Sequence, residues 1–191
     1  MSFFKYAGFL SAITVSTAAF AEGSATNLDL LGSVGFTQTT NSSSEAPKYN
    51  GYNLGASALF AVSDTALGSP VVGGGVNFAH TFKDDFSLIK LSLLGHAGFK
   101  FKATNELAIF ALGNIGYSPV LFSRNSKTSK NSDFYFKNYS YGASLIGMYK
   151  VMPEISVGAG ATYNFNYNKD QFDNANRWNE LSANVYVAYS L

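Results

Sequence analysis

The sequence predicts an all-β fold, an eight-stranded antiparallel transmembrane β-barrel, and three observations support this prediction. Eight segments alternate between apolar residues and small or polar residues, and segments of about ten such residues are typical of membrane barrels. Charged residues make up only 13% of the chain and aromatic residues 16%, whereas soluble domains carry roughly 25% charged residues. After the N-terminal segment, no apolar run reaches the length of about twenty residues that a membrane-spanning helix needs.

The N-terminal segment is predicted to be a signal peptide. Lys5 supplies a positive charge, an apolar stretch follows it, and Ala19 and Ala21 form an A-x-A cleavage site before Glu22. The alternative, an uncleaved membrane anchor, is less favoured because the apolar stretch is short. The expected domains are a signal peptide at residues 1–21 and a barrel domain at residues 22–191.

The first four segments are expected at residues 27–39, 51–63, 70–82 and 86–101. Successive side chains of a strand point to opposite faces, so each segment has one apolar face. On that face lie, in chain order, Leu30 and Phe36, Leu54 and Phe60, Val72 and Phe78, and Leu91 and Phe99. A tight hairpin is expected between the third and fourth segments, at Lys83, Asp84 and Asp85.

The last four segments are expected at residues 106–118, 134–151, 155–167 and 181–191. They show the same alternation, with outward pairs at Ile109 and Ile115, Tyr139 and Leu145, Val157 and Phe165, and Val185 and Tyr189. The gaps after the first, fifth and seventh segments are long, and those after the second, fourth and sixth are short. Membrane barrels have long extracellular loops and short periplasmic turns, so both ends of the barrel chain are expected in the periplasm.

A soluble barrel that encloses a ligand is the main alternative fold. Such a barrel shows a charged face to water and buries its large apolar residues. The second face of these segments instead carries Gly, Ser, Asn, Thr and Ala with few charges, which suits a narrow polar lumen. Large aromatic residues gather towards both ends of the segments, as bilayer interfaces select. The membrane barrel is therefore favoured.

Three stretches carry a resemblance to a known family: residues 105–117, residues 141–147 and residues 153–157. They resemble turn and strand blocks of the small outer-membrane β-barrels that include OmpX-like proteins and OmpA-type transmembrane domains. The resemblance implies an outer-membrane fold, with membrane lipids and lipopolysaccharide around it, but no particular activity. It also implies that the barrel-assembly machinery reads the last strand, here at Val185, Val187, Tyr189 and Leu191, with Leu191 where the family usually has Phe.

Six ionisable residues are expected to face the lumen: Asp29, Lys90, His96, Lys100, Glu106 and Lys150. One interpretation is a charge network that gates a narrow pore, in which Lys100 and Glu106 pair across a turn. The other is that these charges line the rim of a lumen that side chains fill. The second is favoured because an eight-stranded barrel is just wide enough for its own side chains, and large residues such as Phe110 also point inward.

An enzyme acting on lipid A is a weaker alternative, and the protein is not expected to be an enzyme. His80 lies on the lipid-facing side of its segment, with Ser87, Asp84 and Asp85 nearby in sequence. A Ser-His-acid site needs all three groups within hydrogen-bond reach, which spacing does not establish. His80 and His96 form no metal-binding motif, and no metal or cofactor is expected.

The long loops are the favoured place for function. Arg124, Lys127 and Lys130 lie in the fifth gap, and Phe172, Arg177 and Trp178 lie in the seventh. Arg, Lys and aromatic residues suit contacts with lipopolysaccharide phosphates or with a host or phage surface. A net charge of only +1 argues against a nucleic-acid partner. The leading hypothesis is therefore a structural or surface-interaction protein, with a narrow channel as the alternative.

Overall fold

The computed structural model describes residues 28–41, 48–63, 65–84, 86–125, 132–135, 138–168 and 177–191. The predicted signal peptide and its cleavage residues Ala19, Ala21 and Glu22 lie outside these residues. Within the described part, no helix is long and apolar enough to cross a membrane.

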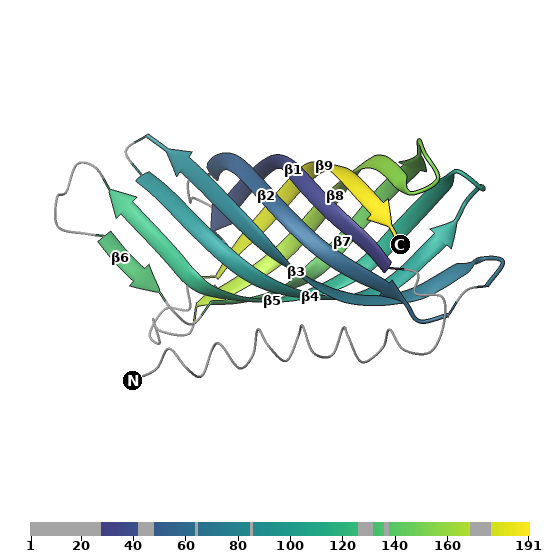
Figure 1. The fold of residues 1–191 in the computed structure, drawn as a ribbon. Coiled ribbons are helices and arrows are strands. Elements are labelled where there is room, and N and C mark those ends of the chain that lie inside the picture. The colour runs from purple at the N-terminus through teal and green to yellow at the C-terminus, as the bar shows by residue number, and fades with distance from the viewer. Residues whose placement is uncertain are drawn as a thin grey trace.

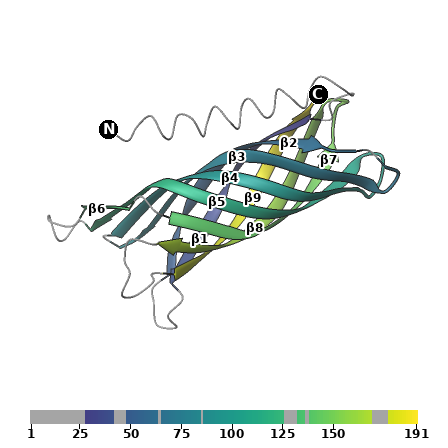
Figure 2. The ribbon, with the colours of Figure 1, turned by 90° about the horizontal axis from the view of Figure 1, so that it is seen from below.

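The described residues form one antiparallel sheet of nine strands: β1 (Leu28–Asn41), β2 (Lys48–Ala61), β3 (Gly68–Lys83), β4 (Phe86–Lys102), β5 (Leu107–Asn125), β6 (Ser132–Tyr135), β7 (Asn138–Lys150), β8 (Ile155–Asn168) and β9 (Arg177–Ser190). The short β6 pairs with β5. The other eight follow one another around a barrel, and β9 pairs with β1 to close it, as Figure 1 and Figure 2 show from two sides. The predicted fold class is confirmed.

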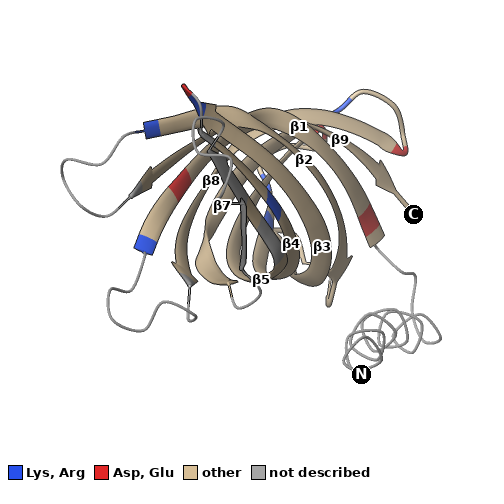
Figure 3. Cartoon of the chain, turned by 90° about the vertical axis from the view of Figure 1, so that its left-hand side faces the viewer, with Lys and Arg blue, Asp and Glu red and all other residues tan. Residues whose placement is uncertain are grey.

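The outer surface of this barrel is apolar. Side chains alternate between exposed and buried along β7 and β9, as the period of two predicts. Ile115 and Leu145, both on the outer face, are 71% and 60% exposed. Figure 3 shows that charged positions are few along the barrel strands. An apolar exterior this continuous is unfavourable in water and matches the hydrocarbon core of a bilayer.

Aromatic side chains gather at both ends of the barrel wall. At one end Tyr141 stacks on Phe165 with ring centroids 5.2 Å apart, and at the other end Phe99 and Phe101 lie 4.6 Å apart. We call the first the loop end, because the β1–β2, β3–β4, β5–β7 and β8–β9 connections lie there, and the opposite one the turn end. Aromatic residues at both levels are typical of the two membrane interfaces.

The fifth strand differs from its expected length. β5 continues to Asn125. Its outermost residues pair with β6, from Leu121 opposite Tyr135 to Arg124 opposite Ser132. The expected long loop at residues 119–133 is therefore partly a hairpin. A register shift opposite Leu91 and Leu93 places an extra residue in β5 beside Pro119, and such a bulge breaks the alternation that marks a strand in the sequence.

The last strand also begins earlier than expected. β9 starts at Arg177, where Tyr167 of β8 pairs with it, instead of at residue 181. Residues 177–180 carry Arg177 and Asn179 at their outward positions, with Trp178 and Glu180 at the others, so they lack the outward apolar side chains that mark a lipid-facing strand in the sequence. Because their backbone still pairs with β8 and β1, their even-numbered side chains enter the lumen.

Candidate functional site

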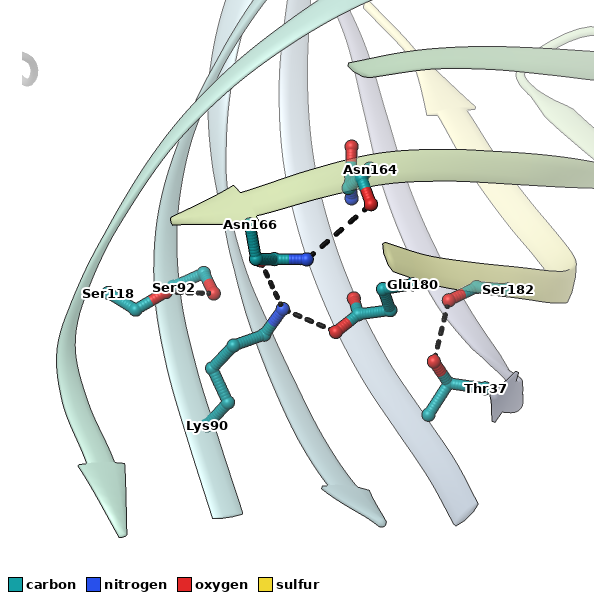
Figure 4. A network of polar contacts seen from close by, with 8 residues as sticks. All are labelled: Thr37, Lys90, Ser92, Ser118, Asn164, Asn166, Glu180 and Ser182. Atoms are coloured by element: carbon teal, nitrogen blue, oxygen red, sulfur yellow. Dashed lines mark hydrogen bonds and ion pairs between the residues drawn. The ribbon is translucent and has the colours of Figure 1, made fainter. Parts of the chain in front are cut away.

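The loop-end half of the lumen holds a buried ion pair. Lys90 of β4 contacts the carboxylate of Glu180 of β9, and the two side chains are 5% and 4% exposed. The Lys90 ammonium also donates a hydrogen bond to the Asn166 amide oxygen at 3.2 Å (Figure 4). Burial of two opposite charges is tolerated when they face each other and have further hydrogen bonds, as here.

Neutral hydrogen bonds surround this ion pair. The hydroxyl groups of Ser92 and Ser118 lie 2.8 Å apart, and the Ser182 hydroxyl donates to the Thr37 hydroxyl at 3.0 Å (Figure 4). Together with Lys90, Glu180 and Asn166, these residues are the outer polar layer. The layer links strands on opposite sides of the barrel, so it braces the loop end from within.

His96 lies at the middle of the lumen and connects three strands. Its Nδ1 lies 2.9 Å from the Asn114 amide oxygen, and its Nε2 lies 3.2 Å from the Ser57 hydroxyl. Because an amide oxygen only accepts, Nδ1 carries the hydrogen and donates it, which leaves Nε2 of the neutral ring to accept from Ser57. The Asn114 amide in turn donates to the Ser144 hydroxyl at 2.7 Å.

The turn end holds a second ion pair. The Lys100 ammonium lies 2.6 Å from one carboxylate oxygen of Asp29, and the Ser190 hydroxyl donates to the other at 2.6 Å. Lys100 also lies 5.2 Å from the centre of the Phe110 ring, within the range of a cation–π interaction. Lys100 of β4 therefore pairs with Asp29 of β1 instead of Glu106, and the hydrogen bond from Ser190 to Asp29 joins β9 and β1 where the barrel closes.

Two of the expected lumenal charges lie elsewhere. Glu106 is exposed in the β4–β5 turn and accepts a hydrogen bond from the Tyr149 hydroxyl at 2.8 Å, on the outer wall. Lys150 is exposed at the last residue of β7. Both residues follow the inward alternation of their neighbours, but Glu106 lies in the turn just before β5 and Lys150 is the last paired residue of β7, so both side chains are exposed at the turn end. Of the six charges expected in the lumen, the structure therefore places four there: Asp29, Lys90, His96 and Lys100.

Apolar side chains fill the lumen between His96 and the turn-end ion pair. This plug consists of buried residues: Leu31, Leu59, Val71, Phe110, Leu112, Ile146, Met148, Tyr186 and Ala188. Leu59 is fully buried. A cavity of about 70 Å³ remains between the plug and the outer polar layer, with room for a few water molecules. Among the described residues, two ion pairs and an apolar plug thus occupy the lumen, with this cavity between them.

Sequence reasoning missed Glu180, the partner of Lys90. It was expected in a loop because the residues before Leu181 are polar. Its signal was the even-numbered series Glu180, Ser182 and Asn184, which extends the lumenal face of the last strand by one position.

The candidate surface residues divide into three groups. Arg124 lies in the outer part of β5, and Arg177 is exposed at the start of β9. Trp178 is buried on the lumenal face of β9, so the expectation that it contacts an outside partner is wrong. Lys127, Lys130 and Phe172 lie outside the described residues. At the other end of β9, Val185, Val187 and Tyr189 face outward and Leu191 is exposed, while their role as an assembly signal stays a prediction.

One further group of side chains meets on the outer wall near the loop end. His80 of β3 contacts Ser87 of β4 and Tyr52 of β2, at 2.8 and 3.0 Å from its two ring nitrogens. The expected neighbour Asp84 lies in the β3–β4 turn with φ of 51°, and Asp85 is outside the described residues. The structure therefore brings His80 and Ser87 together, and Tyr52 occupies the position where an acidic residue was considered.

No family model matches the sequence, and no curated protein is significantly similar to it. Solved structures are similar in fold. The chain superimposes on the Neisserial surface protein A, NspA, with a TM-score of 0.62 and 12% identity, over 86% of this chain and 97% of that one. For the outer membrane enzyme PagL the TM-score is 0.53 with 16% identity, over 85% and 99% of the two chains.

A weaker match is the attachment invasion locus protein Ail of Yersinia pestis. Its TM-score is 0.48 with 14% identity, over 86% of this chain and 99% of that one. The NspA and PagL superpositions show that this chain has the fold of small outer-membrane β-barrels. At these identities the likeness concerns the fold and not the activity.

Proposed function

We propose that this protein is a bacterial outer-membrane barrel that acts as a structural and surface-interaction protein through its loop end. The observation that supports this role most directly is the occupied lumen. Two ion pairs and an apolar plug stand across the space that a solute would have to cross. A barrel of this size is filled by its own side chains, which weighs against the alternative of a narrow channel.

The membrane location rests on the outer wall. Exposed apolar side chains cover it, and aromatic pairs lie at both ends, as at Tyr117 and Tyr139, whose rings are 5.5 Å apart. Lipid replaces water around such a wall. Outer-membrane lipids and lipopolysaccharide are therefore the molecules that surround the barrel, and the last strand offers an outward pattern for the assembly machinery.

The contact surface of the proposal is the β5–β6 hairpin. β5 extends past its bulge and, with β6, projects beyond the neighbouring strands at the loop end (Figure 1). Arg124 lies in this hairpin, and Lys127 and Lys130 stand between β5 and β6 in the sequence. Together with exposed Arg177 and with Phe172 of the neighbouring connection, they favour a partner that carries phosphate or sulfate groups.

Binding of intact cells to immobilised heparin, used as a polyanion probe, tests this proposal. The variant Lys127→Gln with Lys130→Gln removes two charges without shortening the loop, and we expect it to reduce binding about tenfold. The matched control is Lys150→Gln, which removes one charge at the turn end and leaves binding unchanged. Equal binding by the wild type and the double variant would contradict the proposed surface.

Deletion of residues 126–131 tests the same surface more severely. These residues lie between the two hairpin strands, so the barrel strands keep their pairing partners. Deletion of residues 42–47 in the β1–β2 connection, which contains Glu45 and no Lys or Arg, is the control. Loss of binding in both deletion variants would point to general damage to the loop end instead of a specific basic surface.

A further inference from the structure

We propose that the outer wall of the barrel carries a serine hydrolase site for fatty-acyl esters of membrane lipids, with Ser87 as the nucleophile and His80 as the base. Tyr52 is the positioning residue. This activity is separate from the proposed surface contacts, because it lies on the lipid-facing wall and uses none of the hairpin residues.

The three side chains lie side by side on three consecutive strands. Tyr52 of β2 is directly opposite His80 of β3, and Ser87 of β4 is opposite Phe82, two residues along from His80. The His80 Nε2 atom lies 2.8 Å from the Ser87 hydroxyl, and Nδ1 lies 3.0 Å from the Tyr52 hydroxyl. A nucleophile within hydrogen-bond reach of a base, which a third group holds, is the arrangement that activates a serine for covalent catalysis.

The hydrogen bonds allow the reactive form of His80. When Nδ1 donates its hydrogen to the Tyr52 hydroxyl oxygen, the unprotonated Nε2 accepts the hydrogen of the Ser87 hydroxyl. The Tyr52 and His80 rings meet edge to face, with centroids 5.3 Å apart and planes at 84°, so packing also limits rotation of the imidazole. Tyr52 holds His80 in the place where many hydrolases use a carboxylate, and it lacks the charge that would stabilise an imidazolium.

The surroundings indicate the class of substrate. The three side chains belong to the outward-facing positions of their strands, next to the exposed apolar residues Leu54 and Phe82. The exposed Lys83, at the end of β3 before the β3–β4 turn, offers a positive charge to a headgroup phosphate. A substrate at this level therefore has an acyl chain in the bilayer and an ester at the interface, which is the build of a membrane lipid.

The reaction balances with water as the second substrate. The Ser87 oxygen attacks the ester carbonyl carbon while its proton moves to His80 Nε2. The tetrahedral intermediate then expels the lipid alcohol, which takes that proton and leaves an acyl group on Ser87. Water attacks this acyl-enzyme, gives a proton to His80, and releases the fatty acid as the proton returns to Ser87.

Labelling with a long-chain fluorophosphonate, which reacts with activated serines, tests the nucleophile in protein refolded into detergent micelles. We expect label on the wild type, with the modified peptide containing Ser87, and no label on Ser87→Ala or His80→Ala. The control is Ser63→Ala, which changes an exposed serine at the turn end and keeps the label. Circular dichroism and the migration of unheated protein in electrophoresis identify any variant that has not folded.

Hydrolysis of a p-nitrophenyl ester in the same micelles tests the roles of the other two residues. His80→Ala should lower kcat about 100-fold, as the loss of a general base does. Tyr52→Phe should lower kcat about tenfold with KM unchanged, because the ring stays and the hydrogen bond is lost. Incubation with phosphatidylglycerol vesicles and with purified lipopolysaccharide, followed by mass spectrometry of released fatty acids, identifies which lipid is the source.

Folded wild-type protein that takes no label, or a label that persists in His80→Ala, would overturn the proposal. So would hydrolysis that Ser87→Ala leaves unchanged. Loss of heparin binding in the hairpin variants has no bearing on these outcomes, so the two proposals fail independently.

Discussion

The two halves of the lumen solve the same packing problem in different ways. The loop-end half is filled by a polar layer around Lys90 and Glu180, both almost fully buried. The turn-end half is filled by the apolar plug and closed by Lys100 and Asp29, of which Lys100 keeps 22% of its side chain exposed. The barrel thus keeps its more deeply buried ion pair in the loop-end half and its more exposed ion pair at the turn end.

This difference has an energetic meaning. Removing one partner of a buried ion pair leaves an uncompensated charge in a medium of low dielectric constant, whereas a partly exposed charge keeps some contact with water. An apolar side chain removed from a plug leaves a cavity whose cost depends on its size. The two halves should therefore respond differently to single substitutions.

The largest effect is expected from Glu180→Ala in the outer polar layer. It should lower the free energy of unfolding by about 4 kcal/mol, because Lys90 loses its charged partner inside the lumen. Denaturant-induced unfolding of the protein in lipid vesicles, followed by circular dichroism, measures this. Replacing both partners, as Lys90→Met with Glu180→Leu, removes the unpaired charge and should recover most of the loss. A double variant as unstable as Glu180→Ala would contradict this account.

Phe110→Ala in the apolar plug should have the next largest effect, about 3 kcal/mol. Phe110 is 2% exposed, so the substitution leaves a cavity in the place of its ring and also removes the cation–π contact with Lys100. Trp178, the single tryptophan, lies in the lumen at the opposite end and is not altered by this substitution, so its fluorescence can be used to follow unfolding. Ile115→Ala, on the lipid-facing wall of the same strand, is the control and should cost less.

How much of this arrangement the sequence predicts depends on whether a pattern is local. Alternation along one strand is local, so the barrel, its strand faces and the inward position of Phe110 follow from it. The partner of Lys100 is not local: Asp29 lies 71 residues away in the chain, and their meeting depends on how the barrel closes.

The loop end was harder to predict for a related reason. A strand that contacts lipid is recognised in the sequence by its large outward apolar side chains. The first residues of β9 have none at their outward positions. Glu180 and Trp178 therefore looked like loop residues although their backbone is paired. In β5, the extra residue beside Pro119 ended the alternation while the strand continued.

The third effect in size is expected from Asp29→Asn at the turn-end ion pair. We expect a loss of about 1–2 kcal/mol, smaller than for Glu180→Ala, because the Lys100 side chain that loses its charged partner is 22% exposed and keeps contact with water. The same vesicle-based unfolding measurement applies. A loss equal to that of Glu180→Ala would show that the two ends of the lumen are equivalent after all.

The smallest effect is expected from Glu106→Gln, which removes a charge that belongs to neither half of the lumen. Glu106 is exposed in the β4–β5 turn, and its contact with the Tyr149 hydroxyl lies on the outer wall at the level of the interface. Exposed charges contribute little to stability, and glutamine still accepts the same hydrogen bond, so the unfolding midpoint should equal that of the wild type within error. A clear shift of the midpoint would contradict this expectation. It would show that the charge of Glu106 stabilises the turn end, so that the turn between β4 and β5 would have to be counted with the turn-end half of the lumen.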